Sequence, residues 1–272
     1  MLSTLRYIAD HPFNRGRRIA AFQRFAWWQL ASRASQEVVV DWVEPARLAL
    51  RRRMVGATGN LYCGLHEFAD MAFVLHFLRP DDLFLDVGAN VGSYTVLASK
   101  VCGARTVAFE PAEALPFLHR NIAVNGIGDL VTVHAAAVGD HVGTANFTRG
   151  RDAMNRVCID GDVGEPVPMI TLDSLDLQPT LIKLDVEGGE EAVVRGGLRT
   201  LAAATAILTE TNTPFVADTL KGFGFEQRFY DPRARRFVPT PTGSNVLYLR
   251  HENEVLSRLA SAPKRNIFGD TL

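Results

Sequence analysis

The stretch LFLDVGANVGSYTVLAS, residues 83–99, decides how the rest of the sequence is interpreted. A short apolar run, typical of a buried strand, ends in an acid, passes through two glycines and enters a helical pattern. In an open α/β sheet, ligands bind beyond the carboxyl ends of the strands, and the first strand–turn–helix is the usual place. The turn therefore predicts a binding site for a nucleotide-like molecule.

The spacing of the glycines argues against a dinucleotide. The fingerprint G-x-G-x-x-G, started at Gly88, needs glycines at positions 90 and 93, where the sequence has Asn90 and Ser93. Asp86 adds an argument from charge, because an acid at the turn repels a pyrophosphate and attracts an ammonium or sulfonium group. S-adenosylmethionine carries both cations, and backbone N–H groups at the start of the helix could bind its carboxylate.

Glu110 indicates that the ligand contains a nucleoside. It ends the next predicted strand, 22 residues beyond Gly88, where a carboxylate can accept hydrogen bonds from both ribose hydroxyls. NAD enzymes use the same contact, so Glu110 does not choose between the two cofactors. The structural alternative is a tight turn capped locally by Asp86 and Asn90, which leaves Glu110 unexplained.

Strand and helix patterns alternate from residue 66 onward, which predicts a parallel sheet covered by helices on both faces. The helices are expected at about 66–78, 92–101, 113–124 and 214–221. Near the end of the chain, FEQRFYDP and SNVLYLRH predict two antiparallel strands joined by a turn-rich loop. Residues 140–170 are expected to be irregular, and within them 149–169 is either an acceptor-binding lid or an exposed loop.

Five motifs, in their order and spacing, resemble the FkbM-type S-adenosylmethionine-dependent methyltransferases. They are DVGANVGSYT at 86–95, FEP at 109–111, AVGD at 137–140, TLDSL at 171–175 and IKLDVEGGEEAVVRGG at 182–197. The resemblance covers roughly residues 56–250 and implies an α/β fold. In detail, it implies a Rossmann-like class I methyltransferase sheet, mostly parallel with a C-terminal antiparallel hairpin and with helices on both faces.

The same resemblance implies that S-adenosyl-L-methionine is the cofactor and that the acceptor is a hydroxyl group of a carbohydrate, glycolipid or secondary metabolite. Ala137 and Val138 are expected to pack near the adenine, although apolar packing alone is the alternative. The cofactor-binding residues that we expect are Asp86, Gly88, Asn90, Gly92, Tyr94, Glu110, Pro111, Ala137, Val138 and Asp185.

The catalytic candidates follow from the chemistry of a hydroxyl acceptor, which is a poor nucleophile and needs a general base or a metal. In LIKLDVEGGE, strand alternation places Lys183 and Asp185 on one face, where they could form an ion pair. Asp185 could instead cap the following helix, and a histidine at position 66 could be a surface or capping residue. No metal ligand is assigned. The candidate bases are Asp185, Glu187 and His66, with Glu210 and Asn212 completing the rim of the site.

The composition suits one globular domain with an appended segment. The chain has 272 residues, 47% of them hydrophobic, and its three cysteines form neither a C-x-x-C pair nor a metal-ligand spacing. We therefore expect a cytoplasmic protein without disulfides. No apolar run reaches the roughly 20 residues of a membrane span, and arginines stand where a signal peptide needs its apolar core.

The charge is unevenly distributed along the chain. Residues 1–53 hold ten arginines and four acids, a balance of +6, which leaves −7 for the remainder. NRGRRIAAFQRFAWWQLASR predicts an amphipathic helix with Ile19, Phe22, Ala26 and Leu30 on one stripe. VVVDWVEPARLALRRRM, which follows it, predicts a β-hairpin around Glu44-Pro45.

This basic helix has two alternative partners. It docks on its own domain, or it contacts an anionic membrane surface, the latter favoured by Trp27 and Trp28. Such a peripheral contact would be at the inner membrane surface. Nucleic acid is not expected as a partner, because no recognition motif accompanies the arginines.

The sequence thus divides into a basic N-terminal extension, residues 1–55, a methyltransferase domain, 56–250, and a C-terminal tail, 251–272. The expected partner is a small-molecule, glycan or glycolipid acceptor. Two other functions stay open: a module that binds the cofactor but is catalytically inactive, and an NAD(P)-dependent oxidoreductase.

Overall fold

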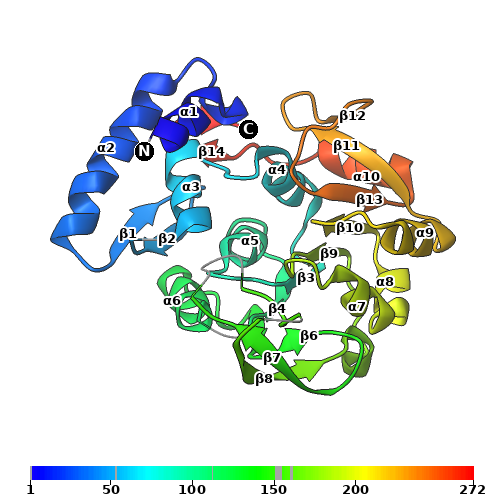
Figure 1. Cartoon of the computed structure of the whole chain (residues 1–272). Helices are drawn as coiled ribbons and strands as arrows, with labels where there is room; N and C mark the ends of the chain where they lie inside the picture. The colour runs from blue at the N-terminus through cyan, green and yellow to red at the C-terminus, as the bar shows by residue number, and fades with distance from the viewer. Residues whose placement is uncertain (1, 53, 112, 151–154, 160–161) are drawn as a thin grey trace.

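An eight-stranded sheet forms the centre of the computed structural model, which describes residues 2–52, 54–111, 113–150, 155–159 and 162–272. The strands run in the order β12-β11-β13-β10-β9-β3-β4-β5 (Figure 1). Their bounds are β3 Leu83–Val87, β4 Arg105–Phe109, β5 Val131–His134, β9 Leu181–Leu184, β10 Ala206–Thr209, β11 Glu226–Asp231, β12 Arg236–Val238 and β13 Val246–Leu249.

Neighbouring strands from β10 to β5 are parallel, whereas β13 and β11 pair antiparallel, so the predicted C-terminal hairpin is confirmed. The chain winds in one direction from β3 through β4 to β5 and then returns to β9 on the other side of β3. The carboxyl ends of β3, β4 and β9 therefore meet at the point where the winding reverses, which is where open α/β sheets bind ligands.

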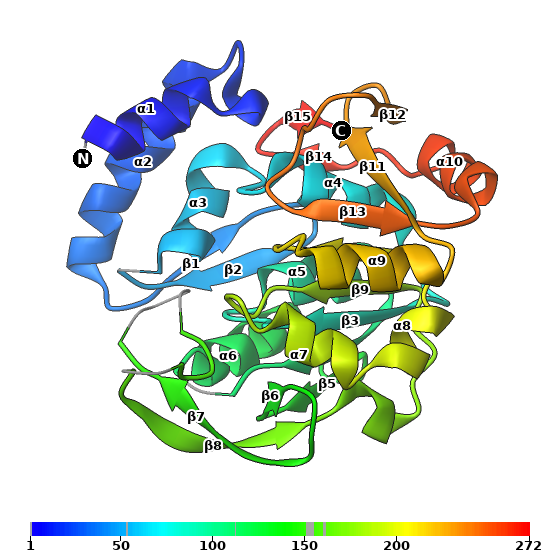
Figure 2. The ribbon, with the colours of Figure 1, turned by 45° about the vertical axis from the view of Figure 1, so that its right-hand side comes forward.

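Helices cover both faces of the sheet, as the sequence predicts. On one face Phe84 packs with side chains of α4 (Phe68–Phe77), α5 (Ser93–Val96, continued by a π-helical turn Leu97–Val101), α6 (Leu115–Asn125) and α10 (Glu252–Ala260). On the other face Leu85 and Val87 pack with α7 (Glu190–Arg195), α8 (Leu198–Ala203) and α9 (Pro214–Gly222) (Figure 2). Burial on both faces explains why β3 is an almost continuous apolar run.

The expectation of an irregular segment at 140–170 is wrong for both of its ends. β7 (Gly143–Thr148) and β8 (Gly164–Ile170) pair with each other, and β6 (Ala137–Val138) completes a small sheet of order β6-β8-β7. Val167 and Met169 point inward and pack with Phe147. Pro166 and Pro168 stand at the exposed positions on either side of Val167, and two prolines in seven residues mask the strand signal. Residues 151–154 and 160–161 of the expected lid lie outside the described residues.

The N-terminal extension packs on the body as α1 (Leu2–Asp10), a short 3-10 turn (Pro12–Asn14) and α2 (Arg18–Ala34), followed by the hairpin strands β1 (Val38–Asp41) and β2 (Arg47–Leu50) and by α3 (Val55–Cys63). The predicted hairpin is confirmed, with Val38 opposite Leu50. Docking of α2 is also observed, through Ala21, Trp28 and the Phe22 of the predicted stripe, whereas the Ile19, Ala26 and Leu30 of that stripe are exposed. The docked face carries the aromatic side chains Phe22, Phe25 and Trp28 and follows only part of the regular apolar spacing.

The C-terminal tail joins this arrangement. Its strands β14 (Asn266–Ile267) and β15 (Asp270–Thr271) form a short hairpin, and Ile267 bridges to Val43 beside β1. Arg17 of the extension pairs with Asp270 of the tail at 3.2 Å. Among the described residues, we find no helix with the length and apolarity to cross a membrane.

Candidate functional site

A cavity of about 920 Å³ opens where β3, β4 and β9 end. Its walls combine the turn after β3, the residues after β4 and β9, and the inner side of the small sheet β6-β8-β7. The position is the one that the reversal of winding predicts, because strands diverging in opposite directions leave a crevice between their connections.

The turn after β3 is held open by glycine and anchored to the neighbouring strand. Gly88 has φ +81°, and a Cβ there would lie 1.8 Å from the backbone oxygen of Asp185, so no other residue fits without displacing β9. The N–H groups of Gly88 and Ala89 donate to the carbonyl of Phe109 at 3.1 and 2.9 Å. Glycine at position 88 therefore allows the ends of β3, β4 and β9 to lie close together.

Glu110 contributes a buried carboxylate to the cavity wall. The side chain is buried, and Oε2 accepts a hydrogen bond of 2.9 Å from the backbone N–H of Asn90. Ala136, Ala137, Val138 and Met169 line the cavity nearby, so the wall is otherwise largely apolar on this side. A buried carboxylate in an apolar wall fits a nucleoside, whose ribose hydroxyls would donate to the carboxylate while the base lies against the apolar side chains.

The structure brings most of the predicted cofactor contacts together around this cavity. The predicted residues that line it are Gly88, Asn90, Glu110, Pro111, Ala137, Val138 and Asp185. The predicted residues that do not line it are Asp86, Gly92 and Tyr94. For these three, contact with the cofactor stays a prediction.

Asp86 lies behind the turn and not at its mouth. It is fully buried, Thr95 Oγ1 donates to Oδ2 at 2.6 Å, and Oδ1 has no hydrogen-bond partner among the described residues. Burial raises the pKa of Asp86, and the charge of Lys183 on the adjacent strand opposes that rise. The cation that interacts with the Asp86 carboxylate in the structure is therefore the ammonium of Lys183.

Lys183 forms the ion pair with Asp185 that strand alternation predicts, with Nζ 2.5 Å from Oδ2. Burial lowers the pKa of Lys183, but the carboxylates of Asp185, Asp86 and Glu67 outweigh it and hold the pKa above its ordinary value. The ammonium also lies 4.7 Å from the centre of the Tyr94 ring. Lys183 is thus a permanent cation beneath the site.

Tyr94 continues this network towards the C-terminal hairpin. Its hydroxyl donates to Glu67 Oε2 at 2.7 Å, and Asn245 Nδ2 donates to Glu67 Oε1 at 3.2 Å. Glu67 precedes α4 and Asn245 precedes β13. Two distant parts of the chain therefore hold Tyr94 in place beside the ion pair of Lys183 and Asp185. Nothing in the sequence predicts the contact of Glu67 with Tyr94, since only tertiary packing brings them together.

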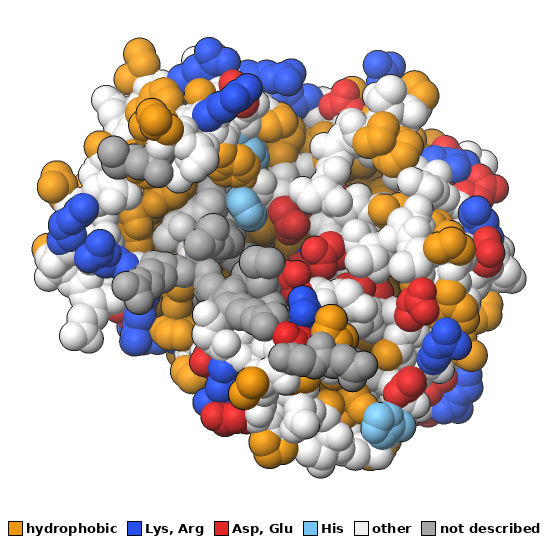
Figure 3. Space-filling model, viewed as in Figure 1, with side chains coloured by type: hydrophobic (Ala, Val, Ile, Leu, Met, Phe, Trp, Pro, Cys, Tyr) orange, Lys and Arg blue, Asp and Glu red, His pale blue; other side chains and the backbone are white. Residues whose placement is uncertain are grey.

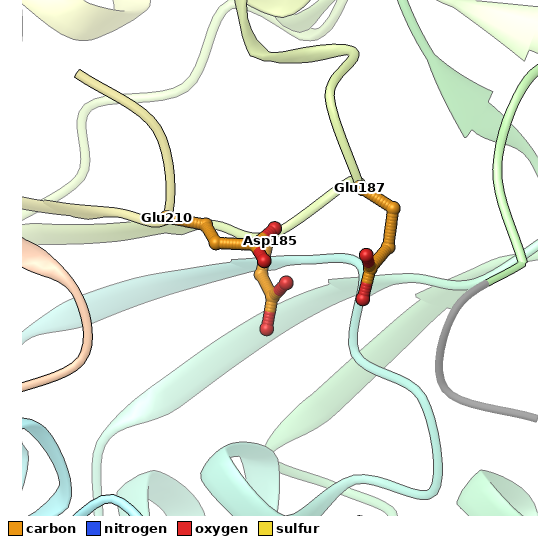
Figure 4. A group of neighbouring side chains, drawn as sticks. All are labelled: Asp185, Glu187 and Glu210. Atoms are coloured by element: carbon orange, nitrogen blue, oxygen red, sulfur yellow. The ribbon is translucent and has the colours of Figure 1, made fainter.

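Three carboxylates gather at the ends of β9 and β10. Asp185, Glu187 and Glu210 each place an oxygen within 4.8 Å of the others, and Glu187 and Glu210 approach Asp185 from two sides (Figure 4). Burial, together with the charges of Asp185 and Glu187, raises the pKa of Glu210 to about 7. Burial and Asp185 also raise the pKa of Glu187. Such a group could take up a proton near neutral pH, and its spacing could alternatively hold a divalent cation.

Glu210 is the functional candidate that the sequence indicates only as part of the rim. The parallel register pairs Thr209 with Leu184, so the next residue along each strand, Glu210 and Asp185, must also be neighbours. The proximity of Glu210 to Asp185 follows from the strand order, because β9 and β10 are adjacent in the sheet. The sequence alone does not give that strand order.

His66, the third predicted base, lies outside the residues that line the cavity. Its Nδ1 is 2.6 Å from the hydroxyl of Tyr7 on α1, and its backbone N–H donates to Asn60 Oδ1 at 2.8 Å. Burial lowers the pKa of His66. The structure ties this histidine to the N-terminal extension, so its role as a base stays a prediction.

Two kinds of similarity connect this chain with known proteins. The ribosomal protein L11 methyltransferase of Syntrophomonas wolfei is 25% identical over 122 residues, which are 43% of this chain and 35% of that protein. The chain therefore matches about a third of the length of this curated relative. The methyltransferase FkbM of Methylobacillus flagellatus KT aligns with a TM-score of 0.47 and 17% identity over 71% of this chain and 52% of that one.

A crystal structure of M. jannaschii TYW2 in complex with AdoMet aligns with a TM-score of 0.44 and 10% identity over 79% of this chain and 85% of that chain. The family model of the methyltransferase FkbM domain matches residues 86–228, more than half of the chain. Its span includes the turn after β3, Glu110 and the strand end with Asp185. The chain accordingly belongs to the FkbM methyltransferase family.

Proposed function

We propose that this protein is an S-adenosyl-L-methionine-dependent O-methyltransferase that methylates a hydroxyl group of a carbohydrate, glycolipid or secondary metabolite. S-adenosyl-L-methionine is the cofactor, and when bound it supplies a methyl group activated on a sulfonium ion. The observation that carries the proposal is the group of carboxylates Asp185, Glu187 and Glu210, of which Asp185 and Glu187 line the cavity and Glu210 adjoins them, with the pKa of Glu210 raised to about 7.

Different residues around the cavity would bind different parts of the cofactor. Glu110 would hold the ribose, because its carboxylate accepts hydrogen bonds from hydroxyl groups, and Ala137 and Val138 would pack against the apolar face of the adenine. Gly88 and Asn90 fix the turn on which the rest of the cofactor would lie. Positioning of the acceptor against the donor can contribute several kcal/mol to the reduction of the barrier.

The carboxylates suit an acceptor rich in hydroxyl groups, since an ionised carboxylate only accepts hydrogen bonds and a hydroxyl donates one. Lys183 pairs with Asp185 and fixes the orientation of its carboxylate through their 2.5 Å contact. A carboxyl with a pKa near 7, such as Glu210, can remove the proton from the acceptor hydroxyl at its carboxylate oxygen. These roles support a hydroxyl acceptor in preference to an acceptor that carries no exchangeable proton.

The test is methyl transfer from labelled S-adenosyl-L-methionine to a panel of glycans, glycolipids and small polyols, with the wild type, Glu210→Gln and the surface control Glu254→Gln. We expect hydroxyl-bearing acceptors to be labelled by the wild type and the control, and much less by Glu210→Gln. Labelling of nitrogen-bearing acceptors alone would contradict O-methylation. A chelator added in parallel shows whether the carboxylates act with a divalent cation or as a base.

The inactive binding module is the main alternative, and the same assay separates it from an enzyme. Cofactor binding without turnover of any acceptor would favour it. A location in the cytoplasm stays a prediction, supported by Cys63, Cys102 and Cys158, all of which are free thiols.

A further inference from the structure

The face of α2 that points away from the body carries three large apolar side chains. Ile19 and Leu30 are 77% and 72% exposed, and Trp27, between them along the helix, is 46% exposed. Residues 19, 27 and 30 fall on one side of an α-helix, because 11 residues are about three turns and 8 residues about 2.2 turns, which keeps the three within an arc of roughly 80°. Three large apolar side chains in one exposed row are more than a scatter of single surface residues.

Some of the arginines of the N-terminal extension lie beside this apolar row. Residues 1–35 contain six arginines and one acid, Asp10. Arg6 pairs with Asp10 and Arg17 with Asp270, and Arg24 faces the body, so the arginines that could meet a membrane are Arg15, Arg18 and Arg33. Arg18 donates to the backbone carbonyl of Ala9 and Arg33 to that of Gln29, so these contacts do not neutralise the guanidinium charges. Figure 3 shows basic and hydrophobic side chains next to each other along the left edge of the molecule, where Figure 1 places α2.

We propose that α2 binds an anionic membrane surface, with Ile19, Trp27 and Leu30 in the interfacial layer and the neighbouring arginines on acidic head groups. An apolar row flanked by arginines matches a surface that is apolar below and negatively charged above. A second protein copy would fit less well, because two copies meeting through this face would bring their arginines together. The inference does not depend on the proposed function, because binding to lipid requires neither cofactor nor acceptor.

The opposite face of α2 makes this binding possible without unfolding. Trp28 is only 4% exposed, and Arg24 donates to the backbone carbonyls of Leu61 and Tyr62 at 2.8 Å each. Tyr7 on α1 contacts His66 beside the body. The helix can therefore lie on a membrane through one face while the other keeps it attached to the domain that carries the site.

Tryptophan fluorescence gives a direct test with the full-length protein. The chain has three tryptophans, and Trp28 and Trp42 are 4% and 3% exposed, so Trp27 is the one that an aqueous quencher reaches. With vesicles of phosphatidylcholine and phosphatidylglycerol we expect a blue shift and protection from iodide. Vesicles of phosphatidylcholine alone should give neither, and high salt should weaken the effect. Trp27→Phe should lose the signal but still sediment with anionic vesicles.

The variant Ile19→Ser/Leu30→Ser tests the apolar row, and both sites are exposed enough to leave folding intact. We expect at least about tenfold weaker sedimentation with anionic vesicles. The matched control Val142→Ser/Val163→Ser changes two exposed apolar residues on the body and should bind as the wild type does. Equal binding by the serine variant and the wild type, or no binding by the wild type, overturns the proposal. So does a wild-type dimer, formed without lipid, that the serine variant abolishes.

Discussion

Glu210 is the side chain whose protonation decides the proposed chemistry. Burial and the charges of Asp185 and Glu187 raise its pKa to about 7, so it is protonated and inactive as a base below that pH. We predict that kcat rises with pH through about 7 and reaches a plateau above it. Glu210→Gln should lower kcat about 10²- to 10⁴-fold and remove this dependence. The measurement is a pH profile of kcat for both proteins.

The control for this profile is Glu254→Gln on the exposed side of α10, which should keep the wild-type curve. A Glu210→Gln variant that retains both the rate and the pH dependence would show that another group removes the proton, and Glu187, whose pKa is also raised, would be the next to test.

We expect Lys183 to contribute more to the free energy of unfolding than to removal of the proton from the acceptor. Its buried ammonium balances Asp86 and Asp185, so Lys183→Met would leave both carboxylates without their cation. Removal of one partner of a buried ion pair costs about 3–5 kcal/mol, and we predict a loss of about 3 kcal/mol here because Asp185 is partly exposed. Urea denaturation measures it. Lys221→Met, at an exposed position of α9, should stay within about 0.5 kcal/mol of the wild type, and a similarly small loss for Lys183→Met would contradict the account.

The turn between β3 and α5 is the element that joins the strand ends to the cavity. A Cβ at Gly88 would meet the backbone of Asp185 at 1.8 Å, whereas Gly224, with a similar φ of +84°, has nothing within 4 Å. Gly224→Ala should therefore cost only the strain of a positive φ, about 1 kcal/mol. Gly88→Ala should cost clearly more and abolish binding of S-adenosylhomocysteine. Denaturation and calorimetry test both variants, and equal losses would show that close packing of β3 on β9 is not important.

The sequence predicts the elements whose pattern is local. β3 and β9 are short apolar runs buried on both faces, and the helices of the body begin and end within about two residues of their expected limits, except that a π-helical turn completes the helix after Gly92. Lys183 and Asp185 follow from the period of a strand. Their contact at 2.5 Å can be predicted from this strand alone, without the rest of the chain.

Features that depend on tertiary contacts cannot be predicted from the sequence alone. β8 carries Pro166 and Pro168 on its outer face, and its strand pattern becomes clear only once β7 is beside it. The docking face of α2 is chosen by the site that receives Trp28, and not by the regular spacing of Ile19 and Leu30. Asp86 is buried next to Lys183 because β3 and β9 are adjacent, which the order of elements along the chain does not reveal.

At the scale of the whole molecule, the two ends of the chain belong to the main hydrophobic core. Ile8 and Phe13 from the N-terminal extension are buried in the same cluster as Ile267 and Leu272 from the tail. We predict that deletion of residues 2–34 exposes this cluster and lowers the urea midpoint substantially, because several large buried side chains lose their partners. An unchanged midpoint would show that the extension folds separately. For the same reason, point variants of α2 test membrane binding better than deletion of the extension.

The central claim is that the cavity at the reversal of winding holds the nucleoside of S-adenosylmethionine through Glu110. Calorimetric titration with S-adenosylhomocysteine, and separately with NAD, of the wild type, Glu110→Gln and Glu254→Gln tests it most directly. We predict micromolar binding of S-adenosylhomocysteine to the wild type and to Glu254→Gln, binding at least about tenfold weaker to Glu110→Gln, and no binding of NAD. Binding of NAD in its place, or equal affinity of Glu110→Gln and the wild type, would contradict the claim.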